Sequence, residues 1–249
     1  MRGVLLAGGT GSRLHPLTES TNKHLLPIAG RPMVEWAIEA LVRAGVTEII
    51  VVTGPEHLAA FQDLLADGRH LDVDRLEFAV QDRPGGIAEA LGLTEAFAGG
   101  GPIVLMLADN LLEGSLADMV GGFGKEPDGA RFLLSEMDDD EHLRHLGVPE
   151  LDNAGHIVKI IEKPAQPPSR FAVTGVYCYE HSVYDVVKTL VPSGRGELEI
   201  TDVNNHYVRA GVARYDVLEG FWGDAGESLE AYRDVDEFVA AHGANIPAR

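Results

Sequence analysis

A glycine-rich loop near the N-terminus carries the residues whose types and spacing most clearly predict chemistry. The run Leu6-Ala7-Gly8-Gly9-Thr10-Gly11-Ser12-Arg13 ends an apolar segment, and Lys23 follows ten residues after Arg13. Glycines let backbone N–H groups approach an anion closely, because no Cβ stands in the way. A guanidinium matches phosphate oxygens as a planar fork, and an ammonium adds a compact point charge. The loop therefore predicts a cradle for a triphosphate, with Arg13 and Lys23 as its cations.

Two other phosphate-binding loops do not fit this run. A dinucleotide fingerprint needs G-x-G-x-x-G leading into a helix, whereas Leu14 stands at the third glycine position and Pro16 follows it. A P-loop needs G-x-x-x-x-G-K-[ST], and the sequence contains no such run. An NAD-dependent oxidoreductase is therefore disfavoured, and a glycine-rich turn that binds nothing stays as the plain structural alternative.

The elements around the loop predict a mostly parallel sheet. In the first half, strands are expected at 4–7, 48–53, 76–81 and 103–108, with helices at 32–44, 55–66 and 87–96. This alternation is typical of βαβ units with right-handed crossovers. In the second half, strands are expected at 130–136, 147–151, 156–161 and 173–179, followed by helices at 182–190, 199–210 and 228–242. These later strands are expected to add to the same sheet in antiparallel or mixed fashion.

Three chemically useful segments follow predicted strands of this sheet. They are the loop at 8–13, the segment 81–86 and Asp109. Ligands bind outside the carboxyl ends of strands in open α/β sheets, so the three are expected at one edge. The Gln81 amide offers a donor and an acceptor to a nucleobase, and Gly86 lets a base lie against bare backbone. Taken alone, Gln81 is better explained as a polar residue that faces water at the end of a strand. The predicted nucleotide-binding residues are Leu6, Ala7, Gly8, Gly9, Gly11, Arg13, Gln81 and Gly86.

Asp109 and Asp224 are the candidate metal ligands. Mg²⁺ prefers one or two carboxylates, completed by substrate phosphate oxygens and water. Taken alone, Asp109 is better explained as a helix N-cap and Asp224 as a turn residue. The acidic run at 138–141 is expected to be a solvated loop or a helix start, because four consecutive carboxylates cannot converge on one ion.

Taken in chain order, the motifs resemble those of the sugar-1-phosphate nucleotidylyltransferases, and most closely the short form of the glucose-1-phosphate thymidylyltransferases. The N-terminal run reads G-G-x-G-x-R-L-x-P-x-T and is followed by K-x-L-L-P-I. The other matching segments are Gln81, 85–90, 108–110, 162–164, 173–175, 195–202 and 222–226. The resemblance spans residues 1 to about 230, nearly the whole chain.

The resemblance implies a Rossmann-like, three-layer α/β/α fold with a mixed, mostly parallel central sheet. Residues 1–249 would form a single domain, with a nucleotide-binding lobe at about 1–128 and a smaller sugar-binding lobe with the C-terminal helices at 129–249. It also makes Mg²⁺ the expected cofactor, held by Asp109 and Asp224. The expected reaction joins a nucleoside triphosphate, dTTP first, to a sugar 1-phosphate, glucose 1-phosphate first.

The resemblance further assigns roles on the sugar side. Glu162 would hydrogen-bond the sugar hydroxyls, while the backbone at Gly147 and Val173 would contact the sugar. Lys163 and Arg195 would contact the sugar phosphate. The expected catalytic residues are Arg13, Lys23 and Lys163.

The composition of the chain disfavours some classes of binding partner. The chain has 249 residues, 45% of them hydrophobic, and a formal net charge of −19. That charge disfavours nucleic acid and anionic membranes, and no apolar run reaches the length of a membrane helix. The single cysteine, Cys178, excludes an intramolecular disulfide and agrees with a reducing cytoplasm. The N-terminus opens into a predicted strand without a signal-peptide pattern, so a cytoplasmic enzyme is expected.

Two residues depart from the family pattern beside the expected sugar pocket. Leu146 stands where relatives usually carry an aromatic residue, and Pro149 confines its strand to an edge or a bulge. The chain also lacks room for the C-terminal extension that, in longer relatives, helps to form subunit contacts and an allosteric site. Feedback control through such a site is therefore not expected, and the oligomeric state is open between a monomer and a small homo-oligomer. UTP or another sugar 1-phosphate remains an alternative, as does a catalytically silent nucleotide- or sugar-binding regulatory subunit.

Overall fold

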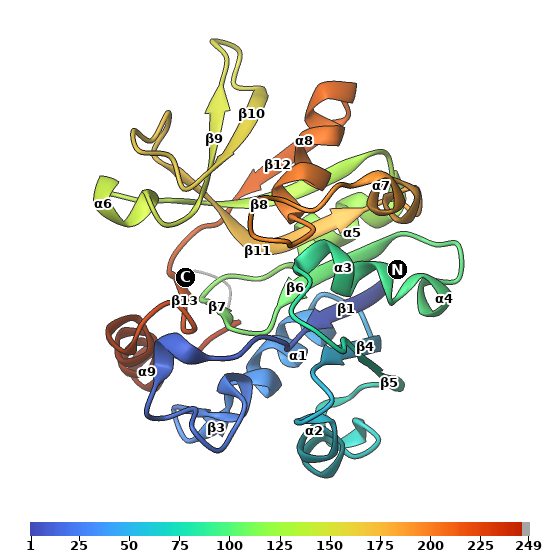
Figure 1. Cartoon of the computed structure of the whole chain (residues 1–249), viewed down its shortest axis with the longest axis vertical. Helices are drawn as coiled ribbons and strands as arrows, with labels where there is room; N and C mark the ends of the chain where they lie inside the picture. The colour runs from blue at the N-terminus through green and yellow to red at the C-terminus, as the bar shows by residue number, and fades with distance from the viewer. Residues whose placement is uncertain (246–249) are drawn as a thin grey trace.

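A seven-stranded mixed sheet forms the centre of the computed structural model, which describes residues 1–245 (Figure 1). Its strands are β1 (Arg2–Leu6), β4 (Glu48–Thr53), β5 (Arg75–Val80), β6 (Ile103–Leu107), β8 (Ala130–Glu136), β11 (Phe171–Tyr179) and β12 (Ala213–Val217). They lie in the order β12-β8-β11-β6-β1-β4-β5. Strand β11 is antiparallel to β6 and β8, and the other neighbours are parallel. The expected mixed, mostly parallel sheet is confirmed.

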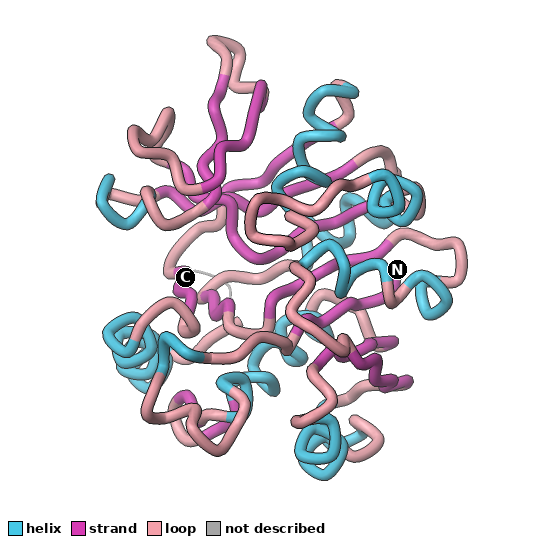
Figure 2. Tube along the Cα trace, viewed as in Figure 1, coloured by secondary structure: helices cyan, strands magenta, loops and turns pink. Residues whose placement is uncertain are grey.

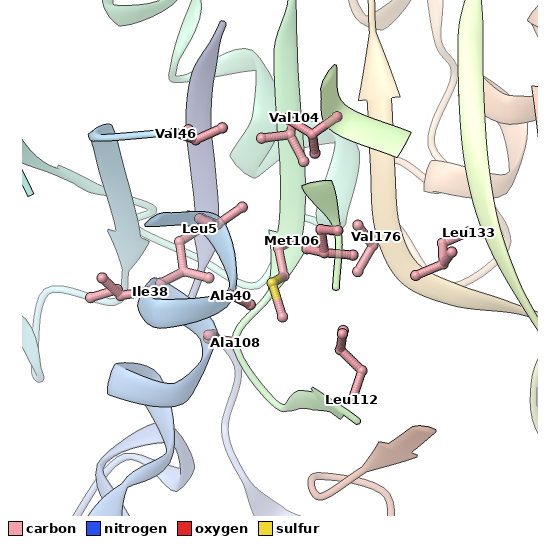
Figure 3. Packing of buried hydrophobic residues seen from close by; sticks show 14 of the residues in the cluster. Leu5, Ile38, Ala40, Val46, Val104, Met106, Ala108, Leu112, Leu133 and Val176 are labelled. Atoms are coloured by element: carbon pink, nitrogen blue, oxygen red, sulfur yellow. The ribbon is translucent and has the colours of Figure 1, made fainter. Parts of the chain in front are cut away.

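Side chains of the central strands alternate between two apolar layers. Leu5, Met106 and Val176 lie together in one layer, as Figure 3 shows, whereas Val4 and Leu6 belong to the layer on the opposite face. Successive strand residues point to opposite faces, so a sheet with apolar residues on both sides must be covered on both sides. The first layer includes α1 (Met33–Arg43), α2 (Leu58–Leu65) and α5 (Ala117–Lys125); the second includes α3 (Ile87–Gly92), α4 (Glu95–Ala98), α7 (Val183–Thr189) and α8 (Ile200–Ala210).

Most expected helices are present with shifted ends. The helix expected at 55–66 begins only at Leu58, and the one expected at 87–96 is divided between α3 and α4. The break falls at Thr94, whose hydroxyl donates to the Leu91 carbonyl and bonds the Tyr184 hydroxyl. This side chain competes with the backbone for helical hydrogen bonds. The acidic run does start a short helix, α6 (Asp140–Leu143).

The expectation that all second-half strands join the main sheet is wrong for one pair. Strands β9 (Gly147–Leu151) and β10 (Ile157–Glu162) form a separate two-stranded sheet, which projects at the top of Figure 1. Pro149 lies in β9, whose ladder partner within residues 1–245 is β10 alone. An edge position tolerates proline because no neighbour needs its missing N–H.

The short strands that connect distant parts of the chain were not predicted from the sequence. Strand β7 (Asn110–Leu112) pairs antiparallel with β13 (Trp222–Asp224), and β2 (Pro27–Ile28) pairs with β3 (Arg31–Pro32). The last helix, α9 (Leu229–His242), follows β13 and packs on the N-terminal third of the chain through Val235 and Val239 (Figures 1 and 2). Within residues 1–245 no helix has both the length and the apolar character needed to cross a membrane.

Candidate functional site

A cavity of about 380 Å³ lies at the carboxyl ends of β1, β4, β5 and β6 and extends toward β9, β10 and β11. Fourteen of the sixteen predicted site residues line it: Leu6, Gly8, Gly9, Arg13, Lys23, Gln81, Gly86, Asp109, Gly147, Glu162, Lys163, Val173, Arg195 and Asp224. The two that do not are Ala7 and Gly11. Segments that are up to about 200 residues apart in the sequence therefore face one space.

Ala7 and Gly11 shape the glycine-rich loop rather than line the cavity. The fully buried Ala7 donates its N–H to the Val52 carbonyl, and its own carbonyl accepts from Asn22 Nδ2 at 3.1 Å. Gly11 has a left-handed backbone (φ 62°), and the Thr18 hydroxyl donates to its carbonyl at 2.7 Å. The loop is thus held at both ends, while Gly9 between them has open space around it.

Arg13 and Lys23 differ in how they are held. Arg13 lies in the short 3₁₀ turn Ser12–Leu14, is exposed, and forms no ion pair within the part of the chain that the structure describes. Lys23 is largely buried, and its Nζ is ion-paired with Asp109 Oδ2. Asp224, at the end of β13, lies close to this ion pair. Gly226 stands between them, because a Cβ at this position would collide with Lys23 Nζ and lie 3.2 Å from Asp224 Oδ1. The ammonium therefore pairs with Asp109 and lies near enough to Asp224 to feel its charge.

The charge balance of this cluster is uneven. Burial alone would lower the pKa of Lys23, but Asp109 and Asp224 outweigh it and raise the pKa. Burial would raise the pKa of Asp109, but the adjacent Lys23 holds it below its ordinary value. Burial and the neighbouring Asp109 raise the pKa of Asp224 to about 7. The cluster therefore holds more carboxyls than its single ammonium can neutralise, and a further cation would compensate for the excess.

The donor set fits a magnesium-type ion rather than a protein-caged metal. Within the described residues no group of three or more His, Cys, Asp and Glu side chains is arranged to hold a metal. Two carboxylates on a cavity are nevertheless what Mg²⁺ uses when substrate phosphates and water supply the remaining ligands. Asp109 and Asp224 are the residues able to hold such an ion.

Neighbours that the sequence analysis left without a role hold these carboxyls in place. Asn110 donates from Nδ2 to Asp109 Oδ1 at 3.1 Å. Its Oδ1 accepts from the Gly175 N–H at 2.7 Å and from Trp222 Nε1 at 2.8 Å, which ties β7 to β11 and β13. His24 lies fully buried beside Asp109, and its burial together with Lys23 lowers its pKa to about 3, so it is neutral. Asn110 and Trp222 lie in the family-like segments 108–110 and 222–226, so their place in those segments could have marked them as site residues.

On the sugar side, Glu162 and Gly147 are paired across the β9–β10 hairpin. Thr201 Oγ1 donates to Glu162 Oε2 at 2.9 Å, which fixes this carboxylate from α8. Lys163 follows with a left-handed backbone (φ 48°), and its N–H donates to the Leu146 carbonyl at 2.9 Å. A non-glycine residue in this conformation is uncommon and indicates that the surrounding contacts impose it. Leu146 itself lines the cavity.

Arg195 approaches from an exposed loop and is already paired. Its Nη2 lies 2.9 Å from Glu199 Oε2 and 3.6 Å from Glu197 Oε2. The hydrogen bond that Arg195 donates to Glu199 is the main cause of the raised pKa of Arg195. A phosphate would have to share this guanidinium with its carboxylates.

The part of the cavity near Gln81 and Gly86 is closed by a tight backbone contact. A Cβ on Gly86, whose φ is 97°, would collide with the Leu198 backbone oxygen. The Leu198 N–H donates to the Gly85 carbonyl at 2.8 Å, and the Ala88 N–H donates to Leu198 at 3.1 Å. Gln81 is held across this turn, since its Nε2 donates to the Gly86 carbonyl at 3.1 Å. The whole arrangement can bind two phosphorylated groups in one cavity, with cations on both sides.

Comparison with known proteins identifies the relatives of this chain. Residues 2–242 match the family model described as nucleotidyl transferase. A glucose-1-phosphate thymidylyltransferase of Actinoplanes sp. is 44% identical over 239 residues, which are 95% of this chain and 77% of the relative. One from Neisseria gonorrhoeae is 39% identical over 96% of this chain and 82% of its own.

Solved structures agree with this similarity. A Bacillus anthracis protein described as a glucose-1-phosphate thymidylyltransferase, in complex with a sucrose, superimposes with a TM-score of 0.90 at 41% identity, covering 96% of this chain and 95% of its own. A UDP-glucose pyrophosphorylase complexed with UDP-glucose reaches a TM-score of 0.83 at 23% identity, covering 95% and 97%. At that identity the second likeness shows the fold alone.

Proposed function

Because this chain belongs to the nucleotidyl transferase family, we propose that it transfers the nucleotidyl group of dTTP to glucose 1-phosphate, giving dTDP-glucose and pyrophosphate. One observation carries the proposal. Arg13, Lys23, Lys163 and Arg195 line one cavity together with Asp109 and Asp224. A triphosphate and a sugar phosphate can therefore meet between them.

The reaction needs no strong general base. A phosphomonoester has a second pKa near 6, so a sugar 1-phosphate is mostly dianionic at neutral pH and can attack directly. Its oxygen attacks the α-phosphorus in line, and the bond to the pyrophosphate oxygen breaks. Catalysis then consists of positioning and charge neutralisation. His24, the buried histidine at the site, is neutral and lies against Asn22 and Asp109, which agrees with the absence of a proton-transfer role for it.

Each cation has a place in this scheme. Arg13 carries no protein partner in the described chain, so its guanidinium is available for the charge that develops on the α-phosphate and the departing pyrophosphate. Lys23 holds the triphosphate from the buried side. Lys163 and Arg195 align the sugar phosphate.

Enzymes of this family generally use a divalent metal, and we propose Mg²⁺ held by Asp109 and Asp224. Bound there, Mg²⁺ would neutralise part of the phosphate charge. The excess of carboxyl groups around Lys23 supports this choice, because the raised pKa of Asp224 marks a place where positive charge is lacking. On the sugar side, Glu162 accepts from a sugar hydroxyl while Thr201 holds it, and the backbone of Gly147 and Val173 borders the sugar.

The proposal also includes the predictions from the sequence about the two lobes, the compartment and the binding partners. Residues 1–128 form the nucleotide-binding lobe and 129–249 the sugar-binding lobe of one domain, in a cytoplasmic enzyme that binds neither nucleic acid nor membrane. UTP or another sugar 1-phosphate is the nearest alternative, because Leu146 borders the sugar region. A silent regulatory subunit is less well supported, since Arg13, Lys23, Asp109, Lys163 and Asp224 all face the cavity.

A pyrophosphate-release assay tests the proposal. Glucose 1-phosphate and Mg²⁺ are incubated with dTTP, UTP, ATP, CTP or GTP, and products are identified by mass. Turnover with dTTP well above the others supports the reaction and the base, and comparable turnover with UTP keeps the reaction but rejects the base. Reactions with EDTA and without sugar phosphate serve as controls. If no triphosphate released pyrophosphate with any of a panel of sugar 1-phosphates, the alternative of a catalytically silent binding subunit would be favoured.

A further inference from the structure

The amide of Gln81 is held by two groups that accept hydrogen bonds. Its Nε2 donates to the Gly86 carbonyl at 3.1 Å and to Glu89 Oε1 at 3.3 Å. Within residues 1–245, Gln81 Oε1 accepts no hydrogen bond. It lies on the side of the glycine-rich loop, since a Cβ on Gly8 would stand 3.7 Å from it. The oxygen end of the amide is thus the end left for a ligand.

The chemistry of the partners determines this orientation. A carbonyl and an ionised carboxylate only accept hydrogen bonds, whereas an amide has a donating and an accepting end. Turning the Gln81 amide over would place its oxygen against the Gly86 carbonyl and the Glu89 carboxylate together. Both hydrogen bonds would be lost and two acceptors would face a third, which is unfavourable in a partly buried site.

Glu89 is itself held in position. It lies in the first turn of α3, and Arg83 Nη2 donates to its Oε2 at 2.8 Å. Gly85 makes room for the carboxylate, because a Cβ at that position would overlap it. The Glu89 side chain is 23% exposed against 74% for Arg83, so the carboxylate lies on the protein side of the pair. The order Arg83, Glu89, Gln81 leads from solvent into the cavity.

We infer that Glu89 is a positioning residue that makes Gln81 present only an acceptor to the nucleobase. The cavity then selects bases with a ring N–H at their pairing edge, such as uracil, thymine or guanine. It rejects cytosine and adenine, which present a ring nitrogen acceptor there. A site that leaves a polar group unpaired against the wrong ligand discriminates strongly. This inference rests on the proposed function, and Glu89 touches the substrate only through Gln81.

The test compares dUTP with dCTP, which differ only at the edge in question. In the wild-type enzyme dUTP is expected to give the higher kcat/KM. In Glu89→Ala only the Gly86 carbonyl still opposes the turned amide, and the ratio of kcat/KM for dUTP to that for dCTP is expected to fall about tenfold, which corresponds to about 1.4 kcal/mol. Glu89→Gln, which keeps an accepting oxygen but can also donate, is expected to give a smaller fall.

The ratio separates positioning from a structural role. If Glu89 merely supported the fold, both nucleotides would lose activity together and the ratio would stay at its wild-type value, which would overturn the inference. A wild-type preference for dCTP would overturn it as well. Glu95→Ala is the matched control: Glu95 also lies in the first turn of a helix and pairs with a cation, Lys188, and its removal should leave the ratio unchanged.

Failure of the proposed function is recognised separately. If the wild-type protein turned over no triphosphate, calorimetric titration with dUTP and dCTP alone would still report base preference. Tighter binding of dUTP, with the preference reduced in Glu89→Ala, would support the inference even then. Equal binding of the two nucleotides by wild-type protein would overturn it.

Discussion

Two clusters that line the cavity each combine one cation expected to bind phosphate with two carboxyl groups. Lys23 pairs with Asp109 and lies near Asp224, whereas Arg195 pairs with both Glu197 and Glu199. They differ in burial, since the Lys23 side chain is 17% exposed and that of Arg195 is 51% exposed.

Because of this difference in burial, the charges of the two clusters interact with different strength. Charges shielded from water interact strongly, so the buried cluster shifts the pKa of each of its three members. Exposed pairs are screened by water and salt and contribute about 0–1 kcal/mol. The buried cluster is therefore a preorganised site, whereas Arg195 can exchange a carboxylate for a phosphate at little cost. The following four predictions test this contrast, from the largest effect to the smallest.

Asp109→Ala should have the largest effect. It removes the partner of Lys23 and one of the two proposed metal ligands, and we expect kcat to fall about 1,000-fold. The fold should persist, because the charge of Asp224 near Lys23 still compensates part of the charge of the ammonium. Pyrophosphate release and circular dichroism measure the two effects. Near-normal turnover would refute the catalytic role of the buried cluster.

The stability of the metal-free protein should fall with rising pH on account of Asp224. Its pKa is about 7 in the folded protein against an ordinary value of 3.8 for an aspartate, so between these values the folded state keeps a proton that the unfolded state has lost. Stability then decreases by about 1.4 kcal/mol per pH unit from about pH 4 to about pH 7. Urea unfolding in EDTA at pH 5, 6 and 7 measures this slope.

Asp224→Asn is the matched variant for the pH experiment. It cannot ionise, so its stability should lack this decrease across the same window. Parallel pH dependences for the variant and the wild-type protein would show that Asp224 does not carry the excess proton.

Arg13→Ala should reduce kcat by about 100-fold, because it removes a cation aimed at developing phosphate charge. Its melting temperature should stay at the wild-type value, since Arg13 is exposed and forms no ion pair in residues 1–245. Steady-state kinetics and a thermal melt check both. A destabilised variant would mean that Arg13 supports the loop rather than the reaction.

Arg195→Ala should have the smallest effect of the four. We expect the KM for glucose 1-phosphate to rise about tenfold, the value of one exposed charge-assisted contact, with little change in kcat. Arg170→Ala is the control, because Arg170 forms a comparably exposed pair with Asp138 and does not line the cavity. If Arg195→Ala lowered kcat as strongly as Asp109→Ala, the contrast between the clusters would fail.

The parts of the fold that were predictable have local causes. Strand β4 was expected at 48–53 and occurs there, because a continuous Ile/Val run needs no distant information to form a buried strand. Helix α9 begins after Ser228, whose side chain accepts from the Ala231 N–H as an N-cap does. The separate β9–β10 sheet was not foreseen, since periodicity marks a strand without naming its partner.

The sequence by itself determined which residue types could do chemistry and that they follow buried strands of a parallel sheet. Spacing placed the glycine-rich loop, Gln81 and Asp109 at one edge, because carboxyl ends of parallel strands meet there. Only the tertiary structure decided that Asp224 lies near the Lys23–Asp109 ion pair, through the pairing of β7 with β13. It also decided that Glu89 orients Gln81. Burial and hydrogen-bond direction depend on residues that meet only after folding, and sequence spacing carries no record of either.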